Sequence, residues 1–127
     1  LQPDFVLLAK FCVSNGLDTI AAFSTEVVSE TNNLHVRDFC PAVGVSESAA
    51  AGTTNAALSS YLLRNGRIHA DIEGKVQVRA EQGIELGRPS IVKTRIKIKD
   101  EHITRLQVGG VASRIIEGVL NINMGAS

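Results

Sequence analysis

Apolar residues near the start of the chain recur at the spacing of an α-helix. Phe5, Leu8 and Cys12 fall on one helical face. The preceding Pro3-Asp4 pair suits a helix start, because proline fits the first helical position and a carboxylate complements the helix dipole. Ser14-Asn15-Gly16 supplies a stop signal. The pattern predicts a surface helix with one apolar face.

Two segments after this helix have the composition of β-strands. Residues 18–29 contain Ile20, Phe23 and further β-branched residues with few helix starters, which predicts one strand. Within residues 34–40, apolar and polar side chains alternate, which predicts a second strand that ends at Pro41.

Residues 44–54 are small, polar and flexible, and we expect them to form a loop. A second helix is predicted from about Thr53 to Asn65, with Gly66 as a left-handed cap. Its side chains are small or apolar nearly all round, and no charge occurs before Arg64. This pattern is typical of a buried helix.

Beyond the second helix the hydrophobic period changes to two. Alternation over residues 75–81 and 95–99 predicts two strands, and Asp100-Glu101 predicts the turn of a hairpin whose partner is 103–108. Gly109-Gly110 predicts a second turn or bulge, after which 111–120 would close the sheet. Four or more strands would therefore follow the helix as a meander.

This order of elements predicts an α+β fold in one domain, residues 1–127. The expected architecture is a strongly curved, mostly antiparallel sheet wrapped around one buried central helix. A chain of 127 residues is long enough for a core of its own.

Charge and composition exclude several classes of function. The 13 basic and 13 acidic residues balance, and aromatics are only 4%, so we expect neither a nucleic-acid nor a membrane partner. No apolar run approaches the roughly 20 residues of a membrane span, and no signal peptide is recognisable. Because the first residue is Leu1, we expect a trimmed or partial chain.

Several reactive side chains are expected to have no chemical role. Cys12 and Cys40 make neither a disulfide framework nor a metal-ligand spacing, so we expect reduced thiols in a cytoplasmic protein and no metal site. The histidines, also without metal-ligand spacing, are His35, His69 and His102. One strand face is basic and is interpreted as a solvated, edge-protecting face; it carries Lys93, Arg95, Lys97 and Lys99.

The start of the second helix is the candidate ligand site. Unpaired N–H groups and a partial positive charge favour an anion there, and Gly52 lets a ligand approach the backbone. The N–H groups of Gly52, Thr53 and Thr54 would hold a carboxylate or phosphate. The alternative is that Thr53 caps its own helix.

Several motifs, in this order, resemble the second half of proteins of the PhzF-like, or phenazine-biosynthesis-like, isomerase family. Residues 81–90, EQGIELGRPS, are the most distinctive stretch. The others are Leu1-Gln2-Pro3-Asp4, Arg37-Asp38-Phe39-Cys40-Pro41, Gly44-Val45-Ser46-Glu47-Ser48, Gly52-Thr53-Thr54-Asn55, Val108-Gly109-Gly110 and Gly118-Val119-Leu120.

The resemblance implies a diaminopimelate-epimerase-like fold of two lobes, each a sheet around a central helix, of which this chain would be the C-terminal one. It also implies a biosynthetic isomerase that shuttles protons on a small carboxylate without a metal or organic cofactor. The substrate would lie between the lobes, where both helix starts face it, and Glu47 would join Gly52, Thr53 and Thr54 in binding.

The chain departs from the family at positions that carry chemistry. Ala51 stands where epimerase relatives have Cys, and Ser48 stands where PhzF-like members commonly have Asp. Glu47 matches the family but is better suited to structure than to chemistry. The principal catalytic carboxylate is expected in the first lobe, so no confident catalytic residue is assigned here.

Two hypotheses follow from these matches and departures. In the first, the chain is one lobe of an isomerase and pairs with a missing N-terminal lobe. In the second, it is a catalytically inactive binding or structural module that pairs with itself as a homodimer.

Overall fold

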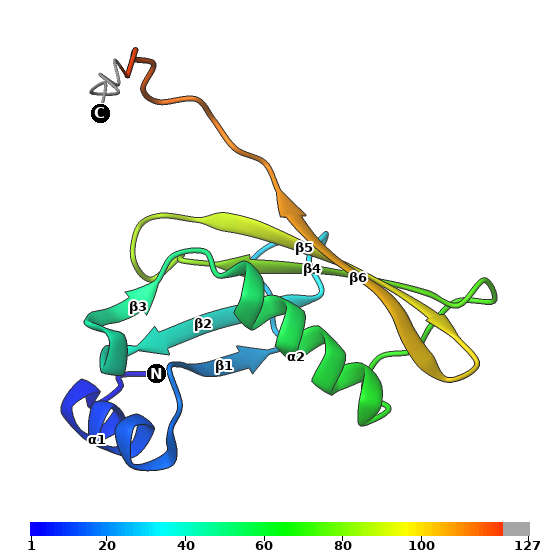
Figure 1. The fold of residues 1–127 in the computed structure, drawn as a ribbon, viewed down its shortest axis with the longest axis horizontal. Helices are drawn as coiled ribbons and strands as arrows, with labels where there is room; N and C mark the ends of the chain where they lie inside the picture. Colours follow the sequence, from blue (N-terminus) through cyan, green and yellow to red (C-terminus); the bar gives the residue numbers. More distant parts are fainter. Residues whose placement is uncertain (121–127) are drawn as a thin grey trace, which may run out of the picture.

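The computed structural model describes residues 1–120 as an α+β fold (Figure 1), which confirms the predicted fold class. None of its helices is long and apolar enough to cross a membrane. The helical elements are α1 (Phe5–Asn15), the short 3-10 helix η1 (Pro41–Val43) and α2 (Gly52–Arg64). The strands are β1 (Ile20–Ser24), β2 (Leu34–Cys40), β3 (Val45–Ser48), β4 (Lys75–Gln82), β5 (Ser90–Lys99) and β6 (His102–Gly110).

All six strands belong to one sheet. Its order is β1-β2-β4-β5-β6, with β3 paired to β2 beside this path. Every pairing is antiparallel except that of β2 with β4, where Leu34 lies opposite Ala80. The parallel pair requires a long crossover, and the chain between β2 and β4 supplies it through β3 and α2.

Helix α1 ends at Gly16 as the sequence predicts, but it begins at Phe5, so Pro3 and Asp4 precede the helix rather than open its first turn. The Asp4 side chain accepts a hydrogen bond from the Leu7 N–H at 3.0 Å, and Gly16 ends the helix with a left-handed φ of 64°. Cys12, on the inner side of the helix, is completely buried, and the Phe5 ring meets the Phe39 ring edge-on with centroids 6.1 Å apart. These contacts hold α1 against the end of β2.

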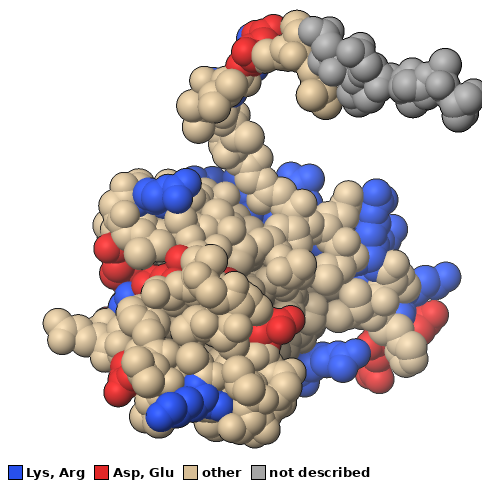
Figure 2. Space-filling view, turned by 60° about the vertical axis from the view of Figure 1, so that its left-hand side comes forward, with Lys and Arg blue, Asp and Glu red and all other residues tan. Residues whose placement is uncertain are grey.

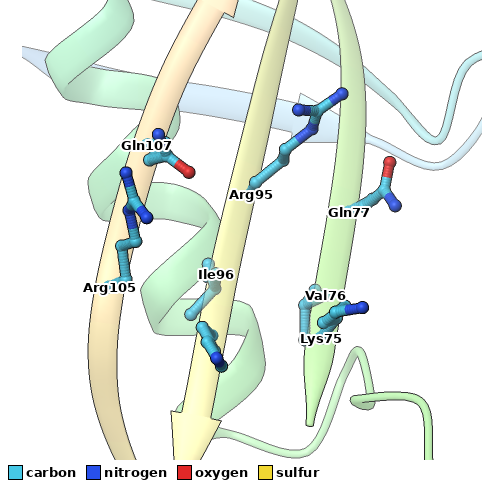
Figure 3. Close-up of a pocket in the computed structure, with 8 residues that line it drawn as sticks. Lys75, Val76, Gln77, Arg95, Ile96, Arg105 and Gln107 are labelled. Carbon is cyan, nitrogen blue, oxygen red and sulfur yellow. The ribbon is translucent and has the colours of Figure 1, made fainter. Parts of the chain in front are cut away.

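The main core lies between α2 and one face of the sheet. Leu58 and Leu62 of α2 pack against inward-facing residues of the central strands, such as Val36 and Ile96. Polar side chains of β4, β5 and β6 project from the opposite face, with α2 behind the sheet (Figure 3).

Burial of α2 is one-sided, in contrast to the predicted burial all round. Tyr61 is 59% exposed and Ala57 is also exposed, whereas Leu58 and Leu62 are buried. The open sheet covers only one side of the helix in this single chain, so its other apolar side faces outward.

Two predictions in the first half of the chain were wrong in extent. The strand expected over 18–29 is confined to β1, and residues 25–33 form a loop because the Glu81 carboxylate, not a sheet neighbour, binds the N–H groups of Val28 and Ser29. The loop expected over 44–54 contains β3, where Glu47 pairs with Phe39.

The predicted closing strand over 111–120 is absent. Gly109 and Gly110 make no turn but stay in β6, opposite Lys93 and Val92, so within residues 1–120 three strands rather than four or more follow α2. A Cβ at Gly110 would lie 2.9 Å from the Ile91 carbonyl oxygen, so glycine is needed for this close pairing. Residues 111–120 then leave the body of the molecule as an exposed segment (Figures 1 and 2).

Candidate functional site

The start of α2 has uncapped backbone donors. The N-cap residue is Ala51, which has no side-chain acceptor, and the first backbone bond of the helix runs from the Asn55 N–H to the Ala51 carbonyl at 3.1 Å. The alternative that Thr53 caps its own helix is therefore wrong. Among the described residues, the N–H groups of Gly52, Thr53 and Thr54 have no hydrogen-bonded acceptor.

A cavity borders this helix start. It has a volume of about 510 Å³, and exposed Gly52 forms part of its wall. A Cβ at Gly52 would lie 3.4 Å from Val108 Cγ1, so a larger side chain there would occupy the space beside β6. The wall also includes Ala50, Pro89, Ser90, Val108 and Gly110. Pro89 and Ser90, at the end of the 81–90 motif, thus line the same cavity as the helix start.

Two buried amides fix the loop that leads into α2. Gln82, with no exposed surface, donates from Nε2 to the Ser48 carbonyl at 2.8 Å. Its Oε1 accepts from Asn55 Nδ2, also at 2.8 Å, and Asn55 Nδ2 donates in turn to the Ala51 carbonyl at 2.8 Å. The network joins β4, the loop and the first turn of α2, and it satisfies polar groups whose burial would otherwise be costly.

Sequence reasoning missed this network, although one signal for it was available. Gln82 continues the inward-facing positions of Val76, Val78 and Ala80, so a polar side chain occupies a core position of β4. A buried amide needs partners, and an amide at a core position therefore indicates a fixed polar contact.

The predicted site residues around Glu47 are engaged within the protein. Both carboxylate oxygens of Glu47 accept from Arg37, at 2.9 Å from Nε and 2.6 Å from Nη2. The Glu47 side chain is 3% exposed. Ser48 donates from Oγ to the Ala50 carbonyl at 3.2 Å. The Arg37–Glu47 ion pair thus links β2 to β3. Neither Ser48 nor Ala51 provides a titratable acid at the helix start.

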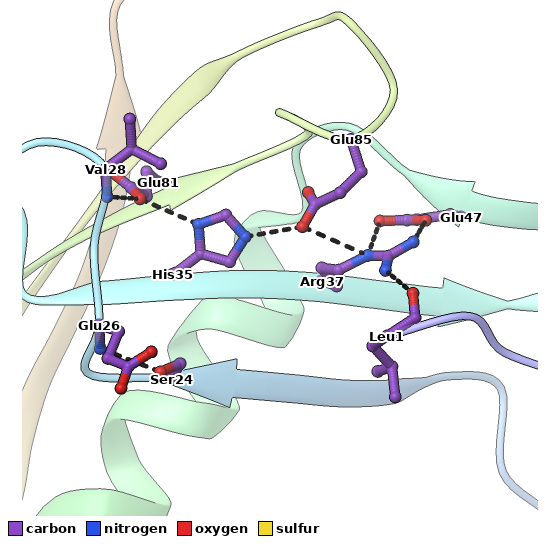
Figure 4. A network of polar contacts seen from close by, with 9 residues as sticks. All are labelled: Leu1, Ser24, Glu26, Val28, His35, Arg37, Glu47, Glu81 and Glu85. Atoms are coloured by element: carbon purple, nitrogen blue, oxygen red, sulfur yellow. Dashed lines mark hydrogen bonds and ion pairs between the residues drawn. The ribbon is translucent and has the colours of Figure 1, made fainter.

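A chain of charged side chains runs across the sheet face opposite α2 (Figure 4). The imidazole of His35 lies between Glu81 and Glu85, with 2.9 Å from Nδ1 to Glu81 and 2.9 Å from Nε2 to Glu85. Arg37 continues the chain, since its Nε lies 3.7 Å from Glu85 and its guanidinium binds Glu47. No local pattern indicated that His35, which was expected to have no chemical role, would join these carboxylates.

Glu81 also fixes the loop between β1 and β2. Its carboxylate accepts from the Val28 N–H at 2.6 Å, the Ser29 N–H at 3.2 Å and Asn32 Nδ2 at 2.5 Å. The His35 bond makes a fourth donor to this buried side chain. The network therefore connects the β1–β2 loop to the turn after β4, where Glu85 lies.

The surroundings shift the pKa values of His35, Glu81 and Glu85. Burial alone would lower the pKa of His35, but its bonds to Glu81 and Glu85 outweigh burial and raise the pKa above 6.5. Burial would raise the pKa of Glu81, yet its four donors lower it to about 2. Burial would also raise the pKa of Glu85, but its hydrogen bonds, that from His35 foremost, and the nearby charges of His35 and Arg37 lower it. The arrangement favours a charged imidazolium between two carboxylates.

Both thiols are buried and free. Burial, followed by the charges of Asp38 and Glu47, raises the pKa of Cys40. Cys12 is the buried residue of α1. Among residues 1–120, no three His, Cys, Asp or Glu side chains gather in a way that would hold a metal ion.

Comparison with known families gives one match over most of the chain. Residues 1–118 match the family described as phenazine biosynthesis-like protein. A trans-2,3-dihydro-3-hydroxyanthranilate isomerase of Pseudomonas chlororaphis is 39% identical over 74 residues, which are 58% of this chain and 25% of that protein. An uncharacterized isomerase of Clostridium acetobutylicum is 26% identical over 97% of this chain and 40% of its own length.

A solved structure supports the fold. The Bacillus anthracis phenazine biosynthesis protein of the PhzF family aligns with a TM-score of 0.65 and 19% identity, over 84% of this chain and 35% of that one. The chain thus spans between a quarter and two fifths of the length of these three proteins.

Proposed function

The chain belongs to the phenazine biosynthesis-like protein family, and on this premise we propose that it forms the C-terminal lobe of an isomerase that moves a proton on a small carboxylate. The isomerase names of its relatives support the reaction class. Its span of a quarter to two fifths of their length supports one lobe. The proposed reaction is cofactor-independent and belongs to a biosynthetic process in the cytoplasm.

The observation that carries the proposal is the set of free N–H groups of Gly52, Thr53 and Thr54 beside the 510 Å³ cavity. These donors, reinforced by the dipole of α2, would bind the substrate carboxylate. A base then removes a proton from a carbon next to that carboxylate, and the electron pair spreads onto the carboxylate oxygens. The helix start stabilises this charge until the proton returns to another position or face.

The proton-transferring group would come from another lobe. General acid–base catalysis needs a titratable side chain within hydrogen-bond reach of the proton. Ser48 and Ala51 supply none, and the carboxylate of Glu47 is held by Arg37. We therefore propose that this lobe binds the substrate carboxylate and that an N-terminal lobe transfers the proton.

The absence of acids at Ser48 and Ala51 also favours a second candidate function. As a catalytically inactive module, the chain would pair with a second copy through the exposed side of α2, where Tyr61 lies. The mass of the natural protein and its sedimentation separate the two functions. A two-lobe monomer supports the enzyme, whereas a one-lobe homodimer supports the module.

The binding role is tested with Gly52→Val in the full-length protein. Valine would fill the space beside the α2 start, so calorimetry with succinate should show binding to the unmodified protein and none to the variant. Ala57→Val is the matched control, because Ala57 is exposed on the same helix and away from the cavity. Unchanged succinate affinity in Gly52→Val would reject the anion site.

A further inference from the structure

Beyond the network of His35, Glu81 and Glu85, the sheet face opposite α2 collects basic side chains from β4, β5 and β6. Cross-strand register places Lys97 of β5 directly between Lys75 of β4 and Arg105 of β6. Two residues along, Arg95 occupies the middle of the next row (Figure 3). We call this surface the basic sheet face; its cations are Lys75, Arg79, Lys93, Arg95, Lys97 and Arg105.

Little negative charge neutralises this face within the protein. Of its six cations, only Lys75 forms an ion pair among the described residues, with Glu73 at the edge of the sheet. Like charges directly opposite one another destabilise a sheet, and Lys97 has a cation on either side. A face that served only solubility would intersperse both signs and avoid this cost.

The face is also hollowed. One depression of about 260 Å³ lies over the row of Lys75, Lys97 and Arg105. A second, of about 300 Å³, lies beside Arg79 and Lys93, and both are bordered by Arg95. Side chains from a binding partner therefore have room to enter between the cations.

The arrangement fits carboxylates on a protein surface better than a nucleic-acid strand. Neighbouring strands lie about 4.8 Å apart, and on β5 the cations Lys93, Arg95 and Lys97 recur at every second residue, about 6.8 Å along the strand. With the cations of β4 and β6 on either side, they make a two-dimensional array. A single-stranded nucleic acid presents one track of charge and stacks its bases on aromatic rings. Strands β4, β5 and β6 contain no Phe, Tyr or Trp.

We propose that the basic sheet face binds an acidic surface of another protein. Guanidinium groups of Arg79, Arg95 and Arg105 would receive carboxylates in pairs of hydrogen bonds, and Lys75 and Lys97 would add charge. Because the whole chain has no net charge, its remaining surface is acidic on balance, and this asymmetry orients an approaching acidic partner toward the basic face.

The test measures binding of an oligoglutamate peptide to the full-length protein by fluorescence anisotropy. The binding variant is Arg95→Glu, Lys97→Glu and Arg105→Glu together. The control variant makes the same charge change with Lys10→Glu, Arg64→Glu and Arg67→Glu, which are exposed on the two helices and the segment after α2. An oligothymidylate of equal charge is measured alongside.

We expect the protein to bind oligoglutamate more tightly than oligothymidylate, and added salt to weaken this binding. The affinity for oligoglutamate should fall about tenfold or more in the binding variant only. No oligoglutamate binding at low salt, equal or tighter binding of oligothymidylate, or an equal loss in the control variant would each overturn the proposal. Thermal unfolding checks folding: the single change Lys97→Glu should not lower the midpoint, since it replaces repulsion by Lys75 and Arg105 with attraction.

Discussion

His35 Nδ1 lies 2.9 Å from a carboxylate oxygen of Glu81, while Nε2 of the same ring lies 2.9 Å from Glu85. Carboxylates only accept hydrogen bonds, so both ring nitrogens must carry protons for the two contacts to form together. The geometry therefore requires the charged imidazolium. The doubly protonated ring of His35 thereby links two segments. Glu81 anchors the β1–β2 loop, and Glu85 lies in the turn that follows β4.

The first prediction concerns stability near neutral pH. The folded-state pKa of His35 lies above its ordinary value of 6.5, so the contribution of His35 is complete below pH 6.5 and is lost as pH rises through the folded pKa. We expect His35→Gln to cost on the order of 1–3 kcal/mol below pH 6.5 and less at alkaline pH. Urea unfolding of both proteins across this pH range measures the difference.

His69 provides the control for this experiment. It is exposed in the segment after α2, and we expect His69→Gln to change the free energy of unfolding little at any pH. If the difference between wild type and His35→Gln stayed constant with pH, the imidazolium bridge would not form in solution.

The second prediction concerns acid. The folded-state pKa of Glu81 is about 2, below its ordinary 4.5, so its contribution is complete above pH 4.5 and is lost as pH falls toward 2. Glu81→Gln should destabilise the protein most above pH 4.5, because an amide cannot accept the same four donors. Glu26→Gln, which alters an exposed carboxylate at the edge of the same loop, is the control.

A Glu81→Gln protein whose acid unfolding followed the wild-type curve would show that this carboxylate does not anchor the β1–β2 loop. Hydrogen exchange at the Val28 and Ser29 amides gives the local readout, since both N–H groups donate to Glu81. Both amides should exchange faster in the variant.

The hairpin of β5 and β6 was predictable because alternation directly reports which face of a strand is buried. Ile96 of β5 faces the core as its spacing predicts, and so do Val76 and Val78 of the neighbouring strand β4. Asp100 and Glu101 form the predicted turn with positive φ values of 50° and 64°. Local residues contain the information that places these strands.

The charged network and strand β3 were not predictable in this way. His35 and Glu81 are 46 residues apart, and no local pattern shows that parallel pairing of β2 with β4 places them opposite one another. β3 is short and owes its place to backbone bonds with β2, which small polar residues do not reveal. The candidate residues at the α2 start could be proposed from the sequence because helix termini have unpaired donors.

The third prediction tests the buried amide that holds the site loop. Gln82→Leu removes the bonds to the Ser48 carbonyl and to Asn55 Nδ2, so that Asn55 Nδ2 keeps only its bond to the Ala51 carbonyl. We expect a loss of about 1–3 kcal/mol in the free energy of unfolding and weaker succinate binding, since the α2 start is no longer fixed.

Gln77→Leu is the matched control for Gln82→Leu. Gln77 lies on the same strand but is exposed on the opposite face, so its replacement should leave succinate binding unchanged. Equal effects of the two changes would mean that the amide network does not position the loop.

The last prediction concerns Gly83, where the turn after β4 touches the site loop. Its φ is 78°, and a Cβ there would lie 2.6 Å from the Ala49 carbonyl oxygen and 2.5 Å from that of Arg88. Gly87 has a similar φ of 64° but no atom within 4 Å of a Cβ. Gly87→Ala should cost about 1 kcal/mol from backbone strain alone, and Gly83→Ala about 2–4 kcal/mol because rigid carbonyls must also move. Denaturant unfolding of the two variants measures their free energies of unfolding, and the difference between them is the cost of the close approach at Gly83. Equal losses of stability would show that the site loop does not contact Gly83 closely.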